Sequence, residues 1–575
     1  MESSLSFRQR IKTLVPIAVR CLRHDYSLKS FFKDLFAGCN VAIIAFPMAI
    51  ACAIGTNIDP ERGLFTGIVA GFLISLLGGS RVQIGGPSSM FLVILYGIML
   101  RHGLDGMLLT TFMGGLILVV LGLAGFGTYI KYIPYTIVSG LTTGIAVVIF
   151  SSQFKGLLGL EMGNVPVDFL SKWQAYWQFL PTFNPASLLI GGMVLAIMIV
   201  LRCYRPQLPG SLIALTIVTV MMVGLHIDVE TIGSKYGMLP RSLPAPHLPY
   251  FELRELLDLV PDALTLAILI GMESLLSAVV AEGMTGWRHQ SNCELIAQGI
   301  ANLCSGLFGG MPATGSLSRT AANIKGGATT PVSGMIHACV LFLLMFLFAP
   351  FVSQIPLSAL AAVLMMTAWS MSRVRHFVHL MTAPKRDVVV LLTVFTLTVL
   401  IDLTAAVQVG MILAAFLFMK QMSDRSDVVS NMRKADQDDA HDVEIFSHRD
   451  VPPDIEVFEI NGPLFFGVTD RLKNILNELD KPPKIFILRM QRVPTIDASG
   501  MHALEELYRE CHKQKTLFLL AGVQSAVLHD LKRYRLNELL GQDHLFSHIN
   551  TALEFAREYL RIEKFKVAMR YTQTT

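Results

Sequence analysis

The chain has 575 residues, a length that would allow several ordinary soluble domains. However, 53% of the residues are hydrophobic and only 16% are charged, whereas a soluble domain carries about 25% charged residues. A soluble protein would need more polar surface, and a disordered chain would not contain 34 phenylalanines. The formal net charge of +4 is too small to indicate nucleic-acid binding. Composition therefore predicts an integral membrane protein.

Residues 1–33 form a basic, amphipathic segment that lacks the long apolar run of a signal peptide. Apolar segments then follow one another, and several are shorter than a bilayer is thick. Seven of them make up a first group at 34–226, a polar connector covers 227–257, and seven more make up a second group at 258–422. The fourteen predicted segments are 34–54, 61–78, 87–100, 104–126, 134–157, 185–201, 210–226, 258–282, 291–308, 316–326, 328–350, 356–371, 386–400 and 404–420.

An even number of spans places both termini on the same side of the membrane. With this arrangement, more Lys and Arg residues fall on the side of the termini than on the other side. The excess of positive charge in cytoplasmic loops then predicts that both termini are cytoplasmic and that the connector 227–257 is extracytoplasmic. The expected location is the inner (cytoplasmic) membrane of the cell.

The composition changes after Met422, where a polar segment at 423–452 is typical of a linker. Predicted strands (454–460, 484–490 and 516–522) then alternate with predicted helices (469–480, 498–514, 524–539 and 548–561). This alternation predicts a small α/β domain at 453–563, followed by a tail at 564–575.

Two apolar segments are interrupted by Gly and Pro at corresponding places in the two groups, each at the third segment. The residues that interrupt them are Gly85, Gly86 and Pro87 in the first, and Gly309, Gly310, Pro312 and Gly315 in the second. Each break is followed by Ser, which is typical of a helix that starts part-way through the membrane. The N-terminus of a half-helix attracts an anion, and a pair of such helices indicates a binding site. The alternative is that these Gly and Pro residues only allow close helix packing or a kink.

Ionisable residues at membrane depth are rare in this chain. Glu273 lies deep in the eighth segment, and a carboxylate there indicates a functional site, so we expect it to bind a proton. Alternatively, a neighbouring hydroxyl or backbone group satisfies it. Arg319, at the start of the tenth segment, is the matching cation for an anion, for Glu273 or for a lipid phosphate.

The sequence lacks the common motifs of ATP hydrolysis, of proteases and hydrolases, and of cysteine metal sites. No Walker A, HExxH or GxSxG sequence occurs, and none of the eight Cys residues forms a CxxC pair. We therefore expect neither an enzyme nor a bound metal or cofactor.

Three sequences in order, "GLFTGIVAGFLISLLGGSRVQIGGPSS", "NCELIAQGIANLCSGLFGGMPATGSLSR" and "PTIDASGMHAL", resemble the sulfate permease (SulP) family of anion transporters with their STAS domain. The resemblance extends from about Phe31 to Leu560 and is closest to the bacterial branch of aerobic C4-dicarboxylate transporters. It implies a polytopic α-helical membrane protein of two inverted seven-span repeats, arranged as core and gate domains, with a cytoplasmic α/β STAS domain. It also implies a homodimer.

The resemblance implies a substrate site between the third and tenth segments, lined also by the first and eighth. By this resemblance, Glu273 occupies the position of a proton-coupling residue. In the STAS domain, Ser499 occupies the position that is phosphorylated in soluble relatives, with Asp497 beside it; we favour Asp497 as a plain helix cap. The implied substrate-binding residues are Met48, Cys52, Ser88, Ser89, Ser316, Leu317, Ser318 and Arg319.

These observations predict a secondary active transporter that couples uptake of a C4-dicarboxylate (succinate, fumarate or aspartate) to a proton by alternating access. The expected partners are a small anion, a proton, membrane lipid and a cytoplasmic protein that binds the STAS domain, but no nucleic acid. The alternatives are a sulfate or bicarbonate transporter, and, in another class, a passive anion channel or a membrane signalling scaffold.

Overall fold

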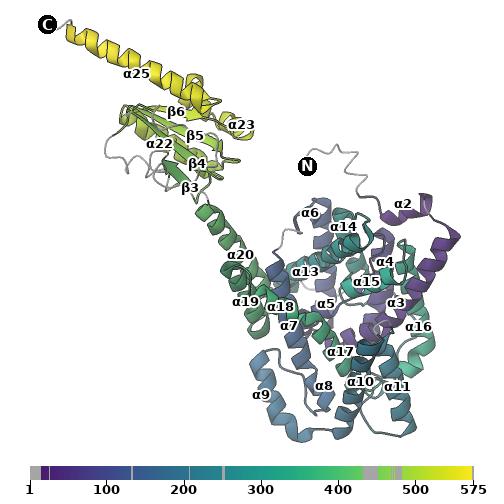
Figure 1. Ribbon diagram of the computed structural model, residues 1–575. Coiled ribbons are helices and arrows are strands. Elements are labelled where there is room, and N and C mark those ends of the chain that lie inside the picture. Colours follow the sequence, from purple (N-terminus) through teal and green to yellow (C-terminus); the bar gives the residue numbers. More distant parts are fainter. Residues whose placement is uncertain are drawn as a thin grey trace. The chain divides into compact units, whose positions relative to one another are not determined.

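The structure is a computed structural model that describes residues 14–24, 26–130, 134–205, 208–248, 253–425, 427–430, 451–452, 454–467, 469, 472 and 482–572. It consists of two compact units, residues 1–413 and 414–575. The first unit is helical, and the second contains a β-sheet (Figure 1).

The helices of the first unit follow the predicted segments closely, although their ends differ by several residues. Those up to the connector are α2 (Ile17–His24), α3 (Leu28–Gly55), α4 (Pro60–Leu77), η2 (Ser89–Phe91), α5 (Leu92–Leu123), α6 (Gly127–Ile130), α7 (Tyr135–Ser152), α8 (Phe154–Leu158), α9 (Phe169–Phe179), η3 (Leu180–Thr182), α10 (Pro185–Tyr204), α11 (Gly210–Gly224) and α12 (Ile232–Tyr236). The rest are α13 (Leu253–Thr285), α14 (Ser291–Leu307), α15 (Leu317–Lys325), α16 (Val332–Val352), α17 (Leu357–Ser372), α18 (Val374–Leu380), α19 (Lys385–Leu400) and the first part of α20 (Leu403–Arg425), which continues into the second unit.

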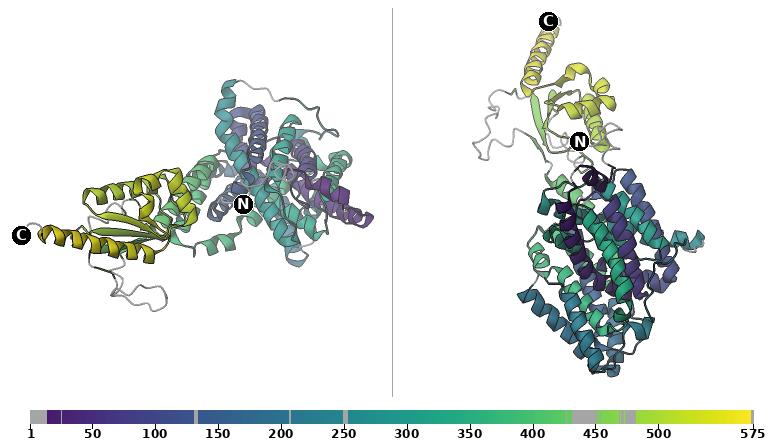
Figure 2. Two further views of the ribbon diagram at one scale, coloured as in Figure 1. Left: turned by 90° about the horizontal axis from the view of Figure 1, so that it is seen from above. Right: turned by 90° about the vertical axis from the view of Figure 1, so that its right-hand side faces the viewer.

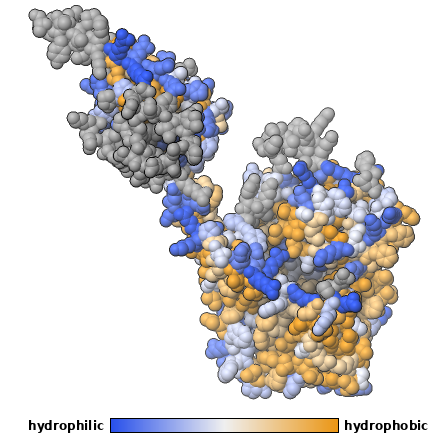
Figure 3. Space-filling model, viewed as in Figure 1, coloured by the Kyte–Doolittle hydropathy of each residue, from blue (hydrophilic) through white to orange (hydrophobic). Residues whose placement is uncertain are grey.

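Among the described residues, nine helices are long and apolar enough to cross a membrane, by length and composition. One of these nine, Ser89–Leu123, contains two predicted segments joined at Gly103, whose φ of 65° produces a kink. The helical unit presents an extensive apolar surface (Figure 3). The predicted number of fourteen spans stays a prediction.

The helices pack in two groups. In the first, α5 packs against α13 and α14, while α16 packs against α3 and α4. In the second, α7 packs against α17 and α19, and α10 packs against α11 and α17. Fewer contacts join the groups, chiefly between α3 and α17. This division corresponds to the core and gate domains that the resemblance implies.

Two short strands, β1 (Gly85–Pro87) and β2 (Ala313–Gly315), lie at the two interrupted segments. They pair antiparallel, with Gly85 opposite Gly315 and Pro87 opposite Ala313. Extended backbone inside a membrane protein requires hydrogen-bond partners, and here each break supplies them to the other. The pairing therefore holds the starts of η2 and α15 beside each other.

The second unit is built on one five-stranded sheet of order β3-β4-β5-β6-β7, in which only the β3–β4 pair is antiparallel. Side chains alternate between two buried faces, as expected for a sheet covered by helices on both sides. Helix α25 covers one face and α22 lies on the other (Figure 2). The elements are β3 (Asp427–Ser430), β4 (Ile455–Asn461), β5 (Ile485–Arg492), α22 (Ala498–Lys513), β6 (Leu517–Ala521), α23 (Ser525–Arg533), α24 (Leu536–Leu540), η7 (Gln542–His544), β7 (Leu545–Phe546) and α25 (Ile549–Thr572).

Several predicted boundaries differ from the structure. Strand β3 lies inside the segment interpreted as a linker, because its pairing with β4 overrides its polar composition. The helix predicted at 524–539 is divided into α23 and α24 at Arg535, whose φ is 59°. Helix α25 continues to Thr572, through most of the predicted tail. The helix predicted at 469–480 and most of the linker lie outside the described residues.

Candidate functional site

The two broken segments place polar groups at the centre of the helical unit. After β1, the hydroxyl of Ser88 caps η2 by accepting a hydrogen bond from the N–H of Met90 at 3.3 Å. After β2, Ser316 is the N-cap of α15, and its N–H donates to the carbonyl of Ile84 at 2.9 Å. Both half-helices therefore begin side by side, as the sequence predicted.

Glu273, on α13, is partly buried and faces the first half-helix. The hydroxyl of Ser88 lies 3.1 Å from both carboxylate oxygens of Glu273 and donates to the carboxylate. A hydroxyl neighbour is thus present, as in the structural alternative considered from the sequence. It also ties the acidic residue directly to the start of η2, because the same hydroxyl caps that helix.

Arg319 connects the two broken segments. Its guanidinium is buried and donates from Nη2 to the carbonyl of Pro87 at 2.7 Å. Gly86, beside it, has a φ of 149°, and a Cβ there would lie 2.6 Å from Nη1 of Arg319. Glycine is therefore required at this position both for its backbone conformation and for the space that the guanidinium occupies.

A cavity of about 230 Å³ lies where these elements meet, between the two groups of helices. Its lining includes Glu273, Arg319, and a further cation, Arg373. The predicted substrate residues that also line it are Met48, Ser88, Ser89, Ser316, Leu317 and Ser318. The structure thus brings together seven of the eight predicted substrate residues and the predicted proton-binding residue around one cavity.

Cys52 is the predicted residue that does not line the cavity. It lies on α3 one turn beyond Met48, and its side chain is completely buried. Four residues advance a helix by slightly more than one turn, about 6 Å along the axis, so Cys52 lies at another depth in the membrane.

Helices α7 and α17 supply lining residues that the sequence did not indicate. These helices are apolar and carry no break or charge within the membrane to distinguish them from other spans. Arg373 follows α17 with a left-handed backbone (φ 42°, ψ 45°) and is exposed to solvent. The lining residues from this part are Tyr135, Val138, Ser139, Thr142, Thr367, Ser370, Met371 and Arg373.

A buried carboxylate on α14, that of Glu294, forms hydrogen bonds with residues next to the site. It accepts hydrogen bonds from the N–H of Gly79 at 2.8 Å, from Nε2 of Gln298 at 2.8 Å and from the hydroxyl of Ser274 at 3.2 Å. Ser274 directly follows Glu273 and also accepts from Nε2 of Gln83 at 2.9 Å. Glu294 was not among the predicted site residues, although an acidic residue in an apolar segment is a detectable signal.

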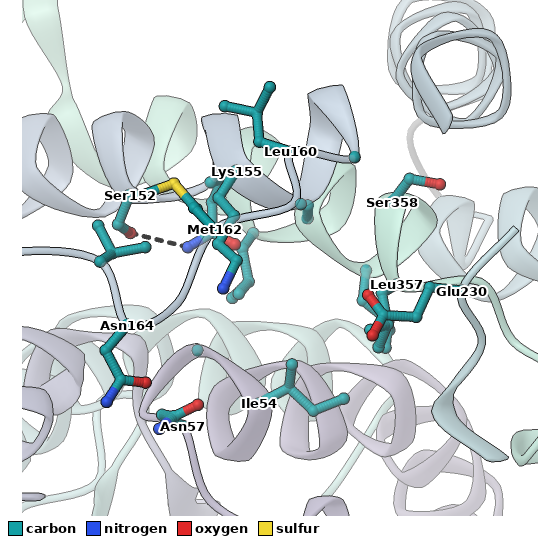
Figure 4. A pocket seen from close by; sticks show the side chains of 18 of the residues that line it. Ile54, Asn57, Ser152, Lys155, Leu160, Met162, Asn164, Glu230, Leu357 and Ser358 are labelled. Atoms are coloured by element: carbon teal, nitrogen blue, oxygen red, sulfur yellow. Dashed lines mark hydrogen bonds between the residues drawn. The ribbon is translucent and has the colours of Figure 1, made fainter. Parts of the chain in front are cut away.

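A larger cavity, of about 710 Å³, lies further along α3, α7 and α17 (Figure 4). On α3, Met48 lines the smaller cavity and Ile54 the larger; on α7, the corresponding residues are Thr142 and Val148. Six helical residues correspond to about 9 Å. We call the residues between these positions, which include Cys52, the apolar layer; Ile50, Ala51, Cys52, Ala53 and Ile145 in it are completely buried.

In the second unit, Asp497 is the N-cap of α22 and accepts a hydrogen bond from the N–H of Gly500 at 2.8 Å. Ser499 is exposed in the first turn of that helix. The geometry therefore gives Asp497 the capping role favoured from the sequence, and leaves modification of Ser499 as a prediction.

Comparisons with known proteins identify the family of this chain. Residues 31–394 match the model of the sulfate permease family, and residues 448–552 match the STAS domain. YvdB of Bacillus subtilis, which bears a sulfate-transporter name, is 39% identical over 91% of this chain and 97% of its own length. The bicarbonate transporter BicA of Synechocystis is 28% identical over 91% of this chain and 94% of its own.

Solved structures show the same fold. SLC26A9 superimposes with a TM-score of 0.84 over 98% of this chain and 96% of its own, at 20% identity. The transmembrane domain of a cyanobacterial BicA gives a TM-score of 0.61 over 66% of this chain and 98% of its own, at 29% identity. The relatives named here are transporters of anions, and none of these names specifies a dicarboxylate. The chain belongs to the sulfate permease family of anion transporters and has a C-terminal STAS domain.

Proposed function

We propose that this anion transporter takes up a dianion together with a proton by alternating access, with a C4-dicarboxylate such as succinate or fumarate as the first candidate. The observation that carries the proposal is the set of charges around the smaller cavity. Among the described lining residues, two arginines, Arg319 and Arg373, accompany one carboxylate, Glu273. A protonated Glu273 leaves two positive charges to balance a dianion, whereas an ionised Glu273 leaves one.

The starts of η2 and α15 add to this positive field. A helix N-terminus carries a partial positive charge and free N–H groups, and the two are held together by β1 and β2. The substrate would therefore bind between Ser88, Ser89 and the Ser316–Arg319 segment, with Met48 beside it. Cys52 would not contact the substrate in this cavity, because it lies in the apolar layer.

The apolar part of the lining favours a dicarboxylate. Val138, Met272, Leu276, Leu317 and Met371 line the cavity together with its charged groups. Methylene groups of a C4-dicarboxylate would contact these side chains, whereas sulfate has no apolar part to place there. Sulfate is the second candidate, because it is also a dianion and because the relative YvdB bears a sulfate-transporter name. Bicarbonate, which BicA transports, is a monoanion; the single positive charge that an ionised Glu273 leaves would balance it, so its binding would need no proton.

Alternating access is supported by the two cavities on either side of the apolar layer. Tyr135 and Arg373, at one end of the smaller cavity, are exposed to solvent, so this cavity opens at that end. We propose that this end faces the cytoplasm and that both termini do so too. Movement of the core helices against α7 and α17 would then expose the same residues to the other side.

Proteoliposomes containing the full chain test the proposal. We expect labelled succinate to accumulate when an inward proton gradient is imposed, and Glu273→Gln to abolish accumulation while leaving binding of succinate measurable. Glu282→Gln is the matched control, because Glu282 lies on the same helix, contacts His289 at 2.6 Å and does not line the cavity. Competition by unlabelled succinate, sulfate and bicarbonate ranks the substrates.

Two results would overturn parts of this proposal. Uptake that ignores the proton gradient would exclude symport and favour a passive channel. Accumulation of sulfate but not of succinate would show that sulfate, and not a C4-dicarboxylate, is the substrate. A homodimer, a protein partner of the STAS domain and location in the inner membrane are further proposals, which cross-linking in cells and accessibility of single cysteines would test.

A further inference from the structure

The larger cavity contains a buried lysine that has no partner among the residues that the structure describes. Lys172, on α9, is 3% exposed and lines this cavity. None of the described residues forms a hydrogen bond or an ion pair with its ammonium group. Burial lowers the pKa of Lys172 to about 8, so the side chain is mainly charged at neutral pH. A cation that lines a cavity and has no partner among the described residues is available to attract an anion.

The position of Lys172 is fixed by its own helix. One turn further along α9, the hydroxyl of Tyr176 donates to the carbonyls of Ser151 and Ser152 at 3.0 and 3.2 Å. The rings of Trp173 and Phe154 pack with their centroids 5.1 Å apart. These contacts anchor α9 on the junction of α7 and α8, and so fix the backbone from which Lys172 reaches the cavity.

Neutral polar side chains surround the same space. Ser152, Gln153, Asn164 and Asn184 line the cavity, and Figure 4 shows Ser152 and Asn164 at its wall. Amide N–H groups and hydroxyls donate hydrogen bonds to anions, so the cavity has donors in addition to the ammonium group. This combination of one cation and several neutral donors suits a small anion.

The other charged groups of the cavity do not neutralise Lys172. Lys155 donates to the carbonyl of Gly163 at 2.7 Å, and Lys235 lies over the ring of Tyr236 at 5.6 Å. The remaining ionisable side chains among the described lining residues are those of Tyr236, of Tyr96, whose hydroxyl donates to Val165, and of the exposed Glu161, Asp228 and Glu230. These carboxylates are solvated, which leaves the charge of Lys172 available.

We propose that the larger cavity is a second anion-binding site, in which Lys172 supplies the positive charge and the neighbouring amides and hydroxyls complete the coordination. Its ligand is a small oxyanion or carboxylate. The apolar layer separates this site from the cavity beside Glu273, so it holds an anion at the opposite end of the transport route. This second site goes beyond the proposed function, and its existence does not depend on which anion the protein transports.

An anionic lysine reagent tests the site directly on the full chain in detergent. Pyridoxal phosphate forms an imine with an amine and loses water, borohydride reduces the imine, and mass spectrometry identifies the labelled lysines. We expect Lys172 to be labelled and to be protected by sulfate or succinate. At an anion concentration ten times the dissociation constant, about one tenth of the sites stay free, so labelling falls about tenfold. Lys385, which is exposed at the start of α19 and lines neither cavity, is the control and keeps its labelling rate.

Thermal unfolding gives a second readout that separates anion binding from a structural role. Sulfate should raise the Tm of wild type and of Lys172→Arg more than that of Lys172→Met, since only the first two keep the charge. Lys172→Met should fold, because it replaces an unpaired charge by an apolar side chain of similar length. Labelling of Lys172 that no anion reduces, or equal stabilisation of Lys172→Met and wild type, would overturn the site. Neither readout depends on Glu273 or on transport.

Discussion

The buried ammonium of Lys172 leads to a stability prediction with a defined sign. At pH 7, in a buffer without small oxyanions, we expect Lys172→Met to be more stable than wild type. The pKa falls from 10.5 to about 8 in the folded chain. A difference of this size corresponds to about 3 kcal/mol of unfavourable free energy for the charged form. For a unit of this length, the corresponding rise in Tm is roughly 3–6 °C.

The advantage of Lys172→Met should depend on pH. Below pH 8, the folded and unfolded chains both keep the proton, so wild type bears the full unfavourable term. Between pH 8 and 10.5, the folded chain loses the proton while the unfolded chain keeps it, so the stability of wild type rises with pH. The difference in Tm between the two proteins should therefore shrink over this window. Other groups, including Tyr236 with its pKa of about 12, titrate in both proteins and cancel.

The assay is thermal unfolding of purified full chain in one detergent from pH 6.5 to 10, followed by intrinsic fluorescence. Lys235→Met is the control, because Lys235 is exposed on the rim of the same cavity. It should change Tm little at any pH. A Lys172→Met protein no more stable than wild type at pH 7, or an advantage that is independent of pH, would refute the reasoning.

Three further predictions concern the broken helices and the STAS domain. In Gly315→Ala, the new Cβ would lie 1.5 Å from Nε2 of Gln83, so uptake by proteoliposomes should fall more than about tenfold. Gly97→Ala is the control: its new Cβ has no atom within 4 Å, so uptake should not change. Ser88→Ala removes the hydroxyl that donates to Glu273, and a hydrogen bond to an ionised carboxylate contributes about 1.5–3 kcal/mol. We therefore expect Ser88→Ala to change the rate of proton-driven uptake and its dependence on pH. An unchanged rate at every pH would contradict the role of this hydroxyl. Asp497→Ala removes a helix cap worth about 1 kcal/mol, which faster hydrogen–deuterium exchange over α22 of the full chain should reveal.

The parts of the site that the sequence could predict are those with an unusual composition for a membrane segment. Gly, Pro and Ser at corresponding places indicated both half-helices, and the isolated charges of Glu273 and Arg319 indicated their neighbours. The structure places all of them around one cavity. What the sequence could not predict is that β1 and β2 pair, because this pairing depends on two segments more than two hundred residues apart.

Other parts lacked any local signal. The lining residues of α7 and α17 belong to ordinary apolar helices, and only the packing of the two helix groups places them at the cavity. Lys172 lies in a segment with no membrane-like composition, so its burial follows from how α9 packs against the α7–α8 junction. Cys52 was selected by resemblance, but its depth on α3 places it in the apolar layer.

The apolar layer also has an electrical consequence. Water and ions extend the bulk potential into both cavities, so the membrane voltage falls mainly across the roughly 9 Å between Met48 and Ile54 on α3. A charge that crosses this layer changes the free energy by about 2.3 kcal/mol per 100 mV. Any ionised group that accompanies the anion across the layer contributes to a current, and the proton on Glu273 alters the sign or size of that current. The steady-state current per transported anion would therefore count the protons that travel with it.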